Sequence, residues 1–377
     1  MSATHPRPAP ARFILVGGFL GAGKTTALAQ LARRYADAGL RVGLITNDQA
    51  ADLVDTEALR VRGFHVEEVA GGCFCCRFDD LARAATRLKE IERPQVYLAE
   101  PVGSCTDLVA TVINPLKRLH GDAYRIAPYS VLLDPARTGR MFLQAGFGGF
   151  SSNVAYIFRK QVEESDIMVL NKSDTLTPEA AARIEAALAH EFPGKRICRV
   201  SALTGDGFDD WAGLLDTAGR SGLNILDLDY DTYAAGEAEL GWLNARLNVA
   251  SMEAFRADDL VLDLLTGIRA SLLEAQMEPA HLKILFSDAD GKGVAVANLI
   301  GSDDPGTRSR SIGLTSRSGA LTINARVQES PDSLRARVEK VLARTARRQR
   351  LIFHPAEVAS FRPARPVPVH RDREPVV

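Results

Sequence analysis

The chain has 377 residues, of which 46% are hydrophobic and 25% charged, and its formal net charge is −1. This length suffices for two domains, and a charge so close to zero gives no overall field that would attract nucleic acid or a membrane. No apolar run is long enough to span a bilayer, and the opening MSATHPRPAPAR lacks the apolar core of a signal peptide. We therefore expect a cytoplasmic protein with reduced thiols and with no nucleic-acid or membrane partner.

We expect a flexible N-terminus at residues 1–11. The first part of the chain after it alternates apolar strands with amphipathic helices. Helical spacing of apolar residues predicts helices at 25–39 and 78–91. Apolar runs predict strands at 12–18, 41–46, 64–70, 95–100, 129–134, 166–171 and 196–203. This alternation predicts an α/β domain over residues 12–222, with a mostly parallel, doubly wound sheet and helices on both faces.

The pattern changes around residues 219–222, and we expect a smaller α+β domain at 223–354. The helices predicted there are 229–244, 257–275 and 330–348, the last beginning with Ser330 as N-cap and Pro331 behind it. The predicted strands are 280–288, 293–301 and 320–328. Residues 355–377 are rich in proline, and we expect a disordered tail.

Residues 18–25 read GFLGAGKT and fit the G-x-x-x-x-G-K-[ST] pattern of a phosphate loop, between a predicted strand and a predicted helix. Its glycines let backbone N–H groups converge on phosphate oxygens, and the helix N-terminus adds positive partial charge. Lys24 would neutralise the β- and γ-phosphates, and the Thr25 hydroxyl would ligate Mg²⁺. The alternative, a chance Gly-rich turn, is disfavoured by this placement. The predicted contacts to a nucleoside triphosphate are Gly18, Gly21, Ala22, Gly23, Lys24, Thr25 and Thr26.

The sequence NKSD at 171–174, which we call the base loop, ends an apolar strand. A carboxylate at Asp174 can accept both the N1–H and the exocyclic amine of guanine, a donor pair that adenine lacks, so the motif favours GTP over ATP. The alternative is a polar turn at a strand end. SALTGDG at 201–207 suits a second loop facing the base, through backbone N–H groups that reach the guanine O6. The predicted base contacts are Asn171, Lys172 and Asp174, with Ser201, Ala202 and Leu203 from the second loop.

Two further segments suit the switch regions of a nucleotide-dependent protein. Glu100 ends a predicted strand in VYLAEPVG, where its carboxylate could hold Mg²⁺ or a Mg²⁺-bound water, and Gly103 would let the backbone move when a γ-phosphate is present. An exposed Glu before a proline turn is the alternative. NDQAADLVD at 47–55 would be the first switch, with Asp48 and Asp55 as candidate metal contacts.

Three of the five cysteines lie in GGCFCC at 71–76, the cysteine turn. Thiolates favour soft or borderline cations, and the two glycines permit the curl that would bring Cys73, Cys75 and Cys76 together. Three ligands leave a tetrahedral Zn²⁺ or Co²⁺ one open position, which suits metal transfer. A redox dithiol and a structural zinc site are the alternatives. Cys105 and Cys198 are predicted to be core thiols.

In chain order, GGFLGAGKTT, TND, GGCFCC, EPVG and QVEESDIMVLNKSD resemble the CobW/HypB/UreG family of P-loop GTPases, in particular its CobW-like metallochaperone branch. The resemblance covers about residues 12–215. It implies a GTPase of low intrinsic rate, with Lys24 and Glu100 acting in catalysis. It also implies Zn²⁺ or Co²⁺ at the three cysteines, delivered to a client metalloprotein or a cobalamin-related pathway.

One alternative function stays open: a GTPase switch that assists assembly or reactivation of a corrinoid or other metallocofactor enzyme and carries no metal itself. For either function the partners would be GTP and a client metalloprotein or cofactor-assembly enzyme, and we also consider a GTP-dependent dimer. In a parallel sheet the strand C-termini share one edge, so we expect the three thiols, Asp48, Glu100 and the γ-phosphate along the same edge.

Overall fold

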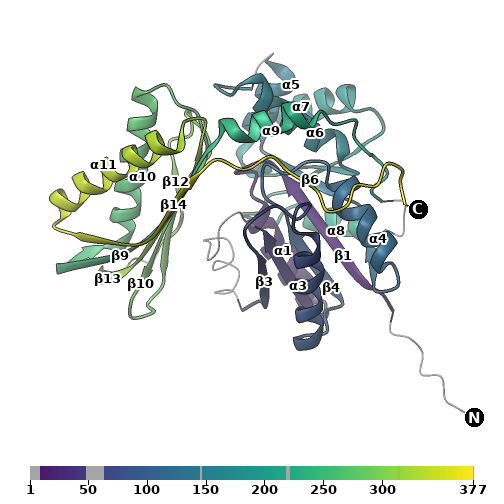
Figure 1. Ribbon diagram of the computed structural model, residues 1–377, viewed down its shortest axis with the longest axis horizontal. Coiled ribbons are helices and arrows are strands. Elements are labelled where there is room, and N and C mark those ends of the chain that lie inside the picture. The colour runs from purple at the N-terminus through teal and green to yellow at the C-terminus, as the bar shows by residue number, and fades with distance from the viewer. Residues whose placement is uncertain are drawn as a thin grey trace, which may run out of the picture.

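The computed structural model describes residues 9–47, 63–144, 147–217, 221–311, 313 and 315–376. It contains two sheets with separate hydrophobic cores, one in each part of the chain (Figure 1). The predicted fold class, an α/β part with a parallel sheet followed by a smaller α+β part, is confirmed. In the described part of the chain, every helix is too short or too polar to cross a bilayer.

The first sheet has the strand order β3-β2-β4-β1-β6-β7-β8, with β5 beside β1, and all of its neighbouring strands are parallel. Its strands are β1 (Ala11–Gly18), β2 (Val42–Asn47), β3 (Val66–Val69), β4 (Val96–Glu100), β5 (Tyr124–Ile126), β6 (Ser130–Leu133), β7 (Ile167–Leu170) and β8 (Arg196–Arg199). β5 is a strand that the sequence analysis did not predict. Because the strands are parallel, their C-terminal ends lie along one edge.

Helices cover both faces of this sheet, because successive residues of the buried strands point to opposite sides. Ile14 and Val16 of β1 pack toward α1 and α8, whereas Phe13 and Leu15 pack on the side of α3 and α6. The helices are α1 (Lys24–Asp37), α3 (Phe78–Ile91), α4 (Asn114–His120), α5 (Pro135–Leu143), α6 (Ser152–Glu164), α7 (Pro178–Glu191) and α8 (Phe208–Asp216). A π-helical turn, Val109–Ile113, leads into α4, and a 3₁₀ turn, Ser173–Thr175, follows β7.

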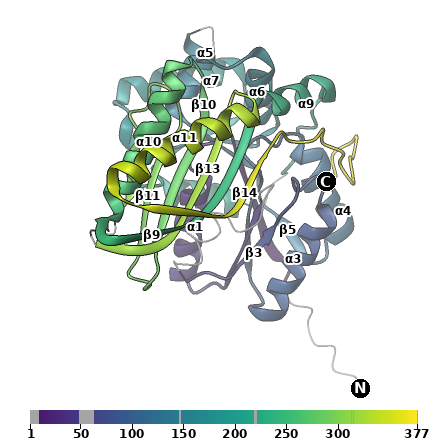
Figure 2. The same cartoon turned by 60° about the vertical axis from the view of Figure 1, so that its left-hand side comes forward.

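The second sheet is antiparallel, with the order β12-β11-β10-β13-β9-β14. Two helices pack on one face of it, as Figure 2 shows, and α9 links the two parts of the chain. The elements are α9 (Tyr230–Glu239), β9 (Gly241–Arg256), α10 (Ala257–Glu274), β10 (Pro279–Asp288), β11 (Val294–Leu299), β12 (Thr307–Arg310), β13 (Thr315–Val327), α11 (Pro331–Gln349) and β14 (Ile352–Phe361). Ser330 caps α11 as predicted, accepting from the N–H of Ser333.

Two expectations for the second part were wrong. The helix predicted at 229–244 ends at Glu239, and the chain enters β9 only two residues later. The tail predicted to be disordered from residue 355 begins instead as β14, which pairs with β9 over ten residues of strand. Its continuation, residues 362–376, runs back over the first domain and ends beside α4 (Figures 1 and 2). We call residues 362–376 the C-terminal strap.

Candidate functional site

The phosphate loop lies between β1 and α1, at the C-terminal edge of the first sheet. The Lys24 ammonium points into the loop and donates to the carbonyl oxygens of Gly18, at 2.9 Å, and Phe19, at 3.4 Å. Gly23 directly precedes α1, and Thr25 and Thr26 lie in its first turn. The structure thus gives the predicted residues the strand–loop–helix geometry that directs backbone N–H groups toward an anion.

Two oxygen ligands of the kind that Mg²⁺ prefers meet beside this loop. β1 and β4 are neighbouring strands, and the Thr25 hydroxyl donates to Oε1 of Glu100 at 3.1 Å. Gly103, on the loop that follows β4, lies against the phosphate loop: a Cβ there would come within 3.0 Å of the Leu20 backbone nitrogen. Only glycine permits this approach, so the β4 loop and the phosphate loop are in direct contact.

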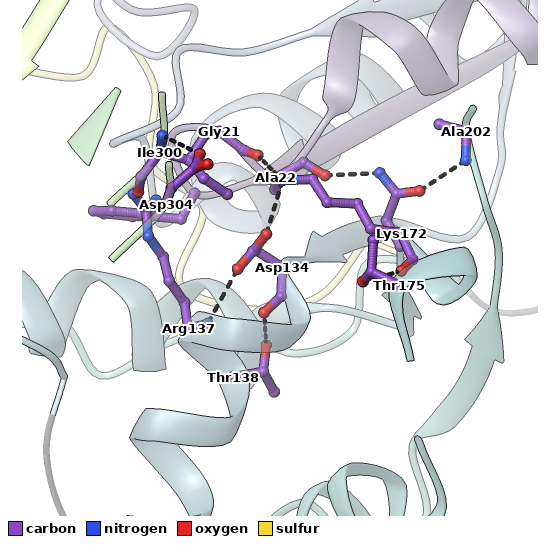
Figure 3. A network of polar contacts seen from close by, with 12 residues as sticks. Gly21, Ala22, Asp134, Arg137, Thr138, Lys172, Thr175, Ala202, Ile300 and Asp304 are labelled. Atoms are coloured by element: carbon purple, nitrogen blue, oxygen red, sulfur yellow. Dashed lines mark hydrogen bonds and ion pairs between the residues drawn. The ribbon is translucent and has the colours of Figure 1, made fainter. Parts of the chain in front are cut away.

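The base loop is fixed to the phosphate loop by one side-chain amide and one ammonium. Asn171 donates through Nδ2 to the carbonyl of Ala22 at 2.8 Å, and its Oδ1 accepts from the N–H of Ala202 at 3.0 Å. Lys172 donates to the carbonyl of Gly21 at 3.0 Å and to Asp134 at 2.8 Å (Figure 3). Asn171 and Lys172 therefore hold the two loops in one arrangement.

The residues predicted to reach the base lie at the open side of this arrangement. Asp174 is exposed, and its Oδ1 accepts from the Ser201 hydroxyl at 2.5 Å. Leu203 is 76% exposed. The Ala202 N–H, predicted to reach the guanine O6, donates to Asn171 in the structure, so a contact with the base would require it to share its hydrogen between the two acceptors.

Arg137, which the sequence analysis did not single out, connects the phosphate loop with the second domain. Its buried guanidinium donates to the carbonyls of Leu20 and Ile300, and to that of Ala280 at 2.5 Å. Its backbone N–H donates to the carboxylate of Asp134, which also accepts from the Lys172 ammonium (Figure 3). Burial lowers the pKa of Arg137 to about 10, which leaves the guanidinium charged at neutral pH.

The cysteine turn follows β3 and brings its three sulfurs together. Cys73 Sγ lies 2.8 Å from Cys75 Sγ and 3.2 Å from Cys76 Sγ, and the last two sulfurs are 3.8 Å apart. Within the described residues, these are the one group of three or more His, Cys, Asp or Glu residues whose ligand atoms all lie within 4.8 Å of one another. Soft sulfur donors at this spacing fit a transition metal of the Zn²⁺ or Co²⁺ kind.

Asn47, at the end of β2, determines the shape of the turn. Its Nδ2 donates to the carbonyls of Val69, at 2.8 Å, and Gly72, at 2.7 Å, and its Oδ1 accepts from the N–H of Phe74 at 2.8 Å. The positive φ of 78° at Gly71 allows the chain to curl there. The phrase TND in the sequence contained this signal, but the sequence analysis gave Asn47 no role.

The thiols of the cluster differ in acidity because they share hydrogen bonds. Hydrogen bonding from Cys105, and then from Cys75 and Cys76, lowers the pKa of Cys73 well below its ordinary value. The pKa values of Cys75 and Cys76 shift in the opposite direction. The hydrogen bond to Cys73 raises the pKa of Cys75 well above its ordinary value and raises that of Cys76 to about 11. These hydrogen bonds therefore favour the thiolate form at Cys73 over that at Cys75 and Cys76. Cys105 and Cys198 are buried, as predicted, but Cys105 also contacts the cluster.

The C-terminal strap lies over the cysteine turn. The N–H of Val367 donates to Cys76 Sγ at 3.2 Å, and the N–H of Val369 donates to the carbonyl of Cys75 at 2.9 Å. Arg371 forms an ion pair with the buried carboxylate of Asp107 at 2.7 Å. These contacts are the physical reason why the predicted loose tail is ordered.

The structure thus brings together the phosphate loop, Glu100, the base loop and the cysteine turn on one edge of the sheet. Asp48 and Asp55, the other candidates, lie outside the described residues. Asn47, Asp134 and Arg137 were not predicted from the sequence as site residues. Asp134 had a signal, because it ends a predicted strand on this edge, whereas nothing in the local sequence distinguished Arg137.

The first domain matches a known protein family. The sequence profile described as CobW/HypB/UreG, nucleotide-binding domain, matches residues 12–198. The chain is 28% identical over 209 residues to the zinc chaperone CobW of Pseudomonas aeruginosa, covering 48% of this chain and 53% of that protein. It is 29% identical over 178 residues to the zinc chaperone YeiR of Escherichia coli, covering 45% and 49%. The chain spans about half the length of the curated relatives it matches.

Among solved structures, the Zn(II)-bound YjiA GTPase from E. coli matches with a TM-score of 0.36 and 14% identity, over 89% of this chain and 99% of that one. HypB from Helicobacter pylori in complex with nickel matches with a TM-score of 0.40 and 16% identity, over 54% and 85%. Residues 12–198 are therefore a nucleotide-binding domain of the CobW/HypB/UreG family.

Proposed function

We propose that this protein is a GTP-dependent metallochaperone, which binds Zn²⁺ or Co²⁺ at Cys73, Cys75 and Cys76 and delivers it to a client metalloprotein or cofactor-assembly enzyme. The observation that carries the proposal is the group of three sulfurs within 4.8 Å on the sheet edge that also holds the phosphate loop. The names of the curated relatives, three of which are zinc chaperones, support zinc as the metal.

In the proposed GTP site, the backbone N–H groups of the phosphate loop and the Lys24 ammonium hold the phosphates. The Thr25 hydroxyl and the Glu100 carboxylate, 3.1 Å apart, are placed to hold Mg²⁺, either directly or through water. Asp174 accepts from the two donors of guanine. GTP hydrolysis removes the charge of the γ-phosphate next to Glu100 and Gly103. The loop that follows β4 then changes its position, because both residues belong to that segment.

In the proposed metal site, the cargo binds to thiolates, so loading releases protons. The pKa of Cys73 is lowered, first by hydrogen bonding from Cys105, and this favours a thiolate there. With three sulfurs bound, a tetrahedral metal retains one position for a ligand of the client. A client thiol or imidazole can therefore enter before the chaperone's own sulfurs leave, which permits transfer without free metal.

Metal analysis of the full chain, purified under reducing conditions, tests the proposal. We expect one equivalent of transition metal in the wild-type protein, its loss in Cys75→Ser, and its retention in the matched control Cys198→Ser, which changes a buried thiol on β8. Wild-type protein that binds GTP and a client enzyme but no metal would instead support the assembly or reactivation switch without cargo.

A further inference from the structure

A fourth thiol adjoins the proposed metal site. Cys105 is 1% exposed and belongs to the same buried core cluster as Cys73 and Cys75. Hydrogen bonding from Cys105 is also the largest cause of the lowered pKa of Cys73. Cys73 Sγ lies 2.8 Å from Cys75 Sγ and 3.2 Å from Cys76 Sγ, and Cys105 is buried in the same core cluster. Four of the five cysteines of the chain converge here, although Cys105 comes from a different strand end than the cysteine turn.

Cys105 lies beside the cluster but outside its mutually close set, which comprises Cys73, Cys75 and Cys76. Zn–S bonds of about 2.3 Å require four tetrahedral sulfurs to lie about 3.8 Å apart. Ligation by Cys105 therefore requires its loop to move toward the other sulfurs. With that movement the donor set becomes four thiolates, the set of closed zinc sites, whereas without it the set has three thiolates and one open position.

The loop that carries Cys105 is the one that begins at Glu100. Gly103, which lies two residues before Cys105 in the chain, packs against the backbone of Leu20. Gln161 of α6 donates to the carbonyls of Gly103, at 3.0 Å, and Cys105, at 2.8 Å. A displacement of Gly103 is therefore shared by Cys105, because both carbonyls are held by the same amide.

We infer that Cys105 is a nucleotide-controlled fourth sulfur ligand, which closes the metal site when GTP is bound and leaves it open when GDP is bound. The inference rests on the proposed function and deepens it. A γ-phosphate with Mg²⁺ orders the loops that contact it, and hydrolysis releases them. Ordering at Glu100 and Gly103 places Cys105 against the metal, and release withdraws it. The metal thus has four sulfur ligands while the protein holds it and three while the protein transfers it.

Zinc K-edge X-ray absorption on the full chain, loaded with one equivalent of Zn²⁺ under reducing conditions, counts the sulfur ligands. We expect four sulfurs with a non-hydrolysable GTP analogue and three sulfurs plus one oxygen or nitrogen with GDP. Cys105→Ser should give three sulfurs in both states, and the matched control Cys198→Ser should behave as the wild type. Because the position is buried, Cys105→Ala is measured in parallel and should also give three sulfurs in both states. The number of sulfur ligands in the wild-type protein tests the inference without any variant.

Chelator competition gives a second measurement. Cys105→Ser should weaken Zn²⁺ binding in the GTP-analogue state by at least roughly 10–100-fold, the loss found even for groups that only orient a ligand, and much less in the GDP state. Three sulfurs in both nucleotide states of the wild type would overturn the inference and leave the proposed metallochaperone intact. An absence of bound zinc in both states would overturn the proposed function and this inference with it.

Discussion

Asp174 presents an exposed carboxylate beside Ser201, whose hydroxyl holds one of its oxygens at 2.5 Å. We expect Asp174→Asn to weaken GTP binding by about 1.5–3 kcal/mol for each of the two charge-assisted bonds lost. The variant should gain affinity for xanthosine triphosphate, because its amide donates where xanthine has a C2 oxygen. Calorimetry with the three triphosphates measures this, and Glu179→Gln, an exposed acid on α7, is the control. Wild-type protein that binds ATP as tightly as GTP would contradict the expected specificity.

Glu164 is a buried carboxyl that accepts from the N–H of Val109, at 3.2 Å, and the hydroxyl of Thr106, at 3.3 Å. Burial, with a contribution from the charge of Asp107, raises the pKa of Glu164 well above its ordinary 4.5. The folded state thus keeps a proton that the unfolded chain has lost, so the free energy of unfolding decreases as pH rises from the ordinary pKa through the raised one.

We therefore expect Glu164→Gln, which cannot titrate, to flatten this decrease by up to about 1.4 kcal/mol per pH unit, the value for one proton. Urea unfolding between about pH 5 and pH 8 measures the slope. Glu163→Gln, the neighbouring and partly exposed acid, should keep the wild-type slope. Equal slopes for the two variants would show that Glu164 does not hold the proton in the folded state.

Among the elements, the C-terminal strap depends on a small number of contacts with the first domain. Arg371→Ala removes the ion pair with Asp107, and we expect the amides of Val367 and Val369 to exchange hydrogen about 10- to 100-fold faster, equivalent to about 1.5–3 kcal/mol. Hydrogen–deuterium exchange measures this directly. Arg373→Ala, an exposed arginine on the same segment, is the matched control, and identical exchange in both variants would show that the strap is held by other contacts.

The same elements show which parts of the structure could be predicted. The phosphate loop, the base loop and the cysteine turn are defined by short local patterns, and the structure places them at the expected strand ends. β14 was missed because its pairing is remote in sequence and it contains Pro355, which lies at a register shift on an edge strand, where proline is tolerated. The strap was missed because backbone hydrogen bonds and three ion pairs with residues distant in the sequence hold it, and neither kind of contact leaves a periodic pattern.

At the scale of the whole molecule, Arg137 joins the two domains. It donates to the carbonyl of Leu20 in the phosphate loop and to the carbonyls of Ala280 and Ile300 in the second domain. We expect Arg137→Met to lower the free energy of unfolding by about 3–5 kcal/mol, because it removes one partner from a buried charged network. Calorimetry should show the two domains unfolding in separate transitions. Arg140→Met is the matched control on the same helix, because Arg140 also forms an ion pair across the domains, with the exposed Asp303. A surface ion pair contributes only about 0–1 kcal/mol to the free energy of unfolding, so this variant should change little. A single unchanged transition in Arg137→Met would contradict this role.

The C-terminal strap also has a consequence for how the protein is synthesised. The amide that bonds to Cys76 belongs to a residue 291 positions further along the chain. At roughly 5–20 residues per second, a ribosome needs about 15–60 s to add that many residues. During this interval the first sheet, complete at Arg199, can fold with Cys76 uncovered by Val367. Metal that arrives while the chain is still being translated therefore meets a more accessible cluster than metal that arrives after the strap is in place.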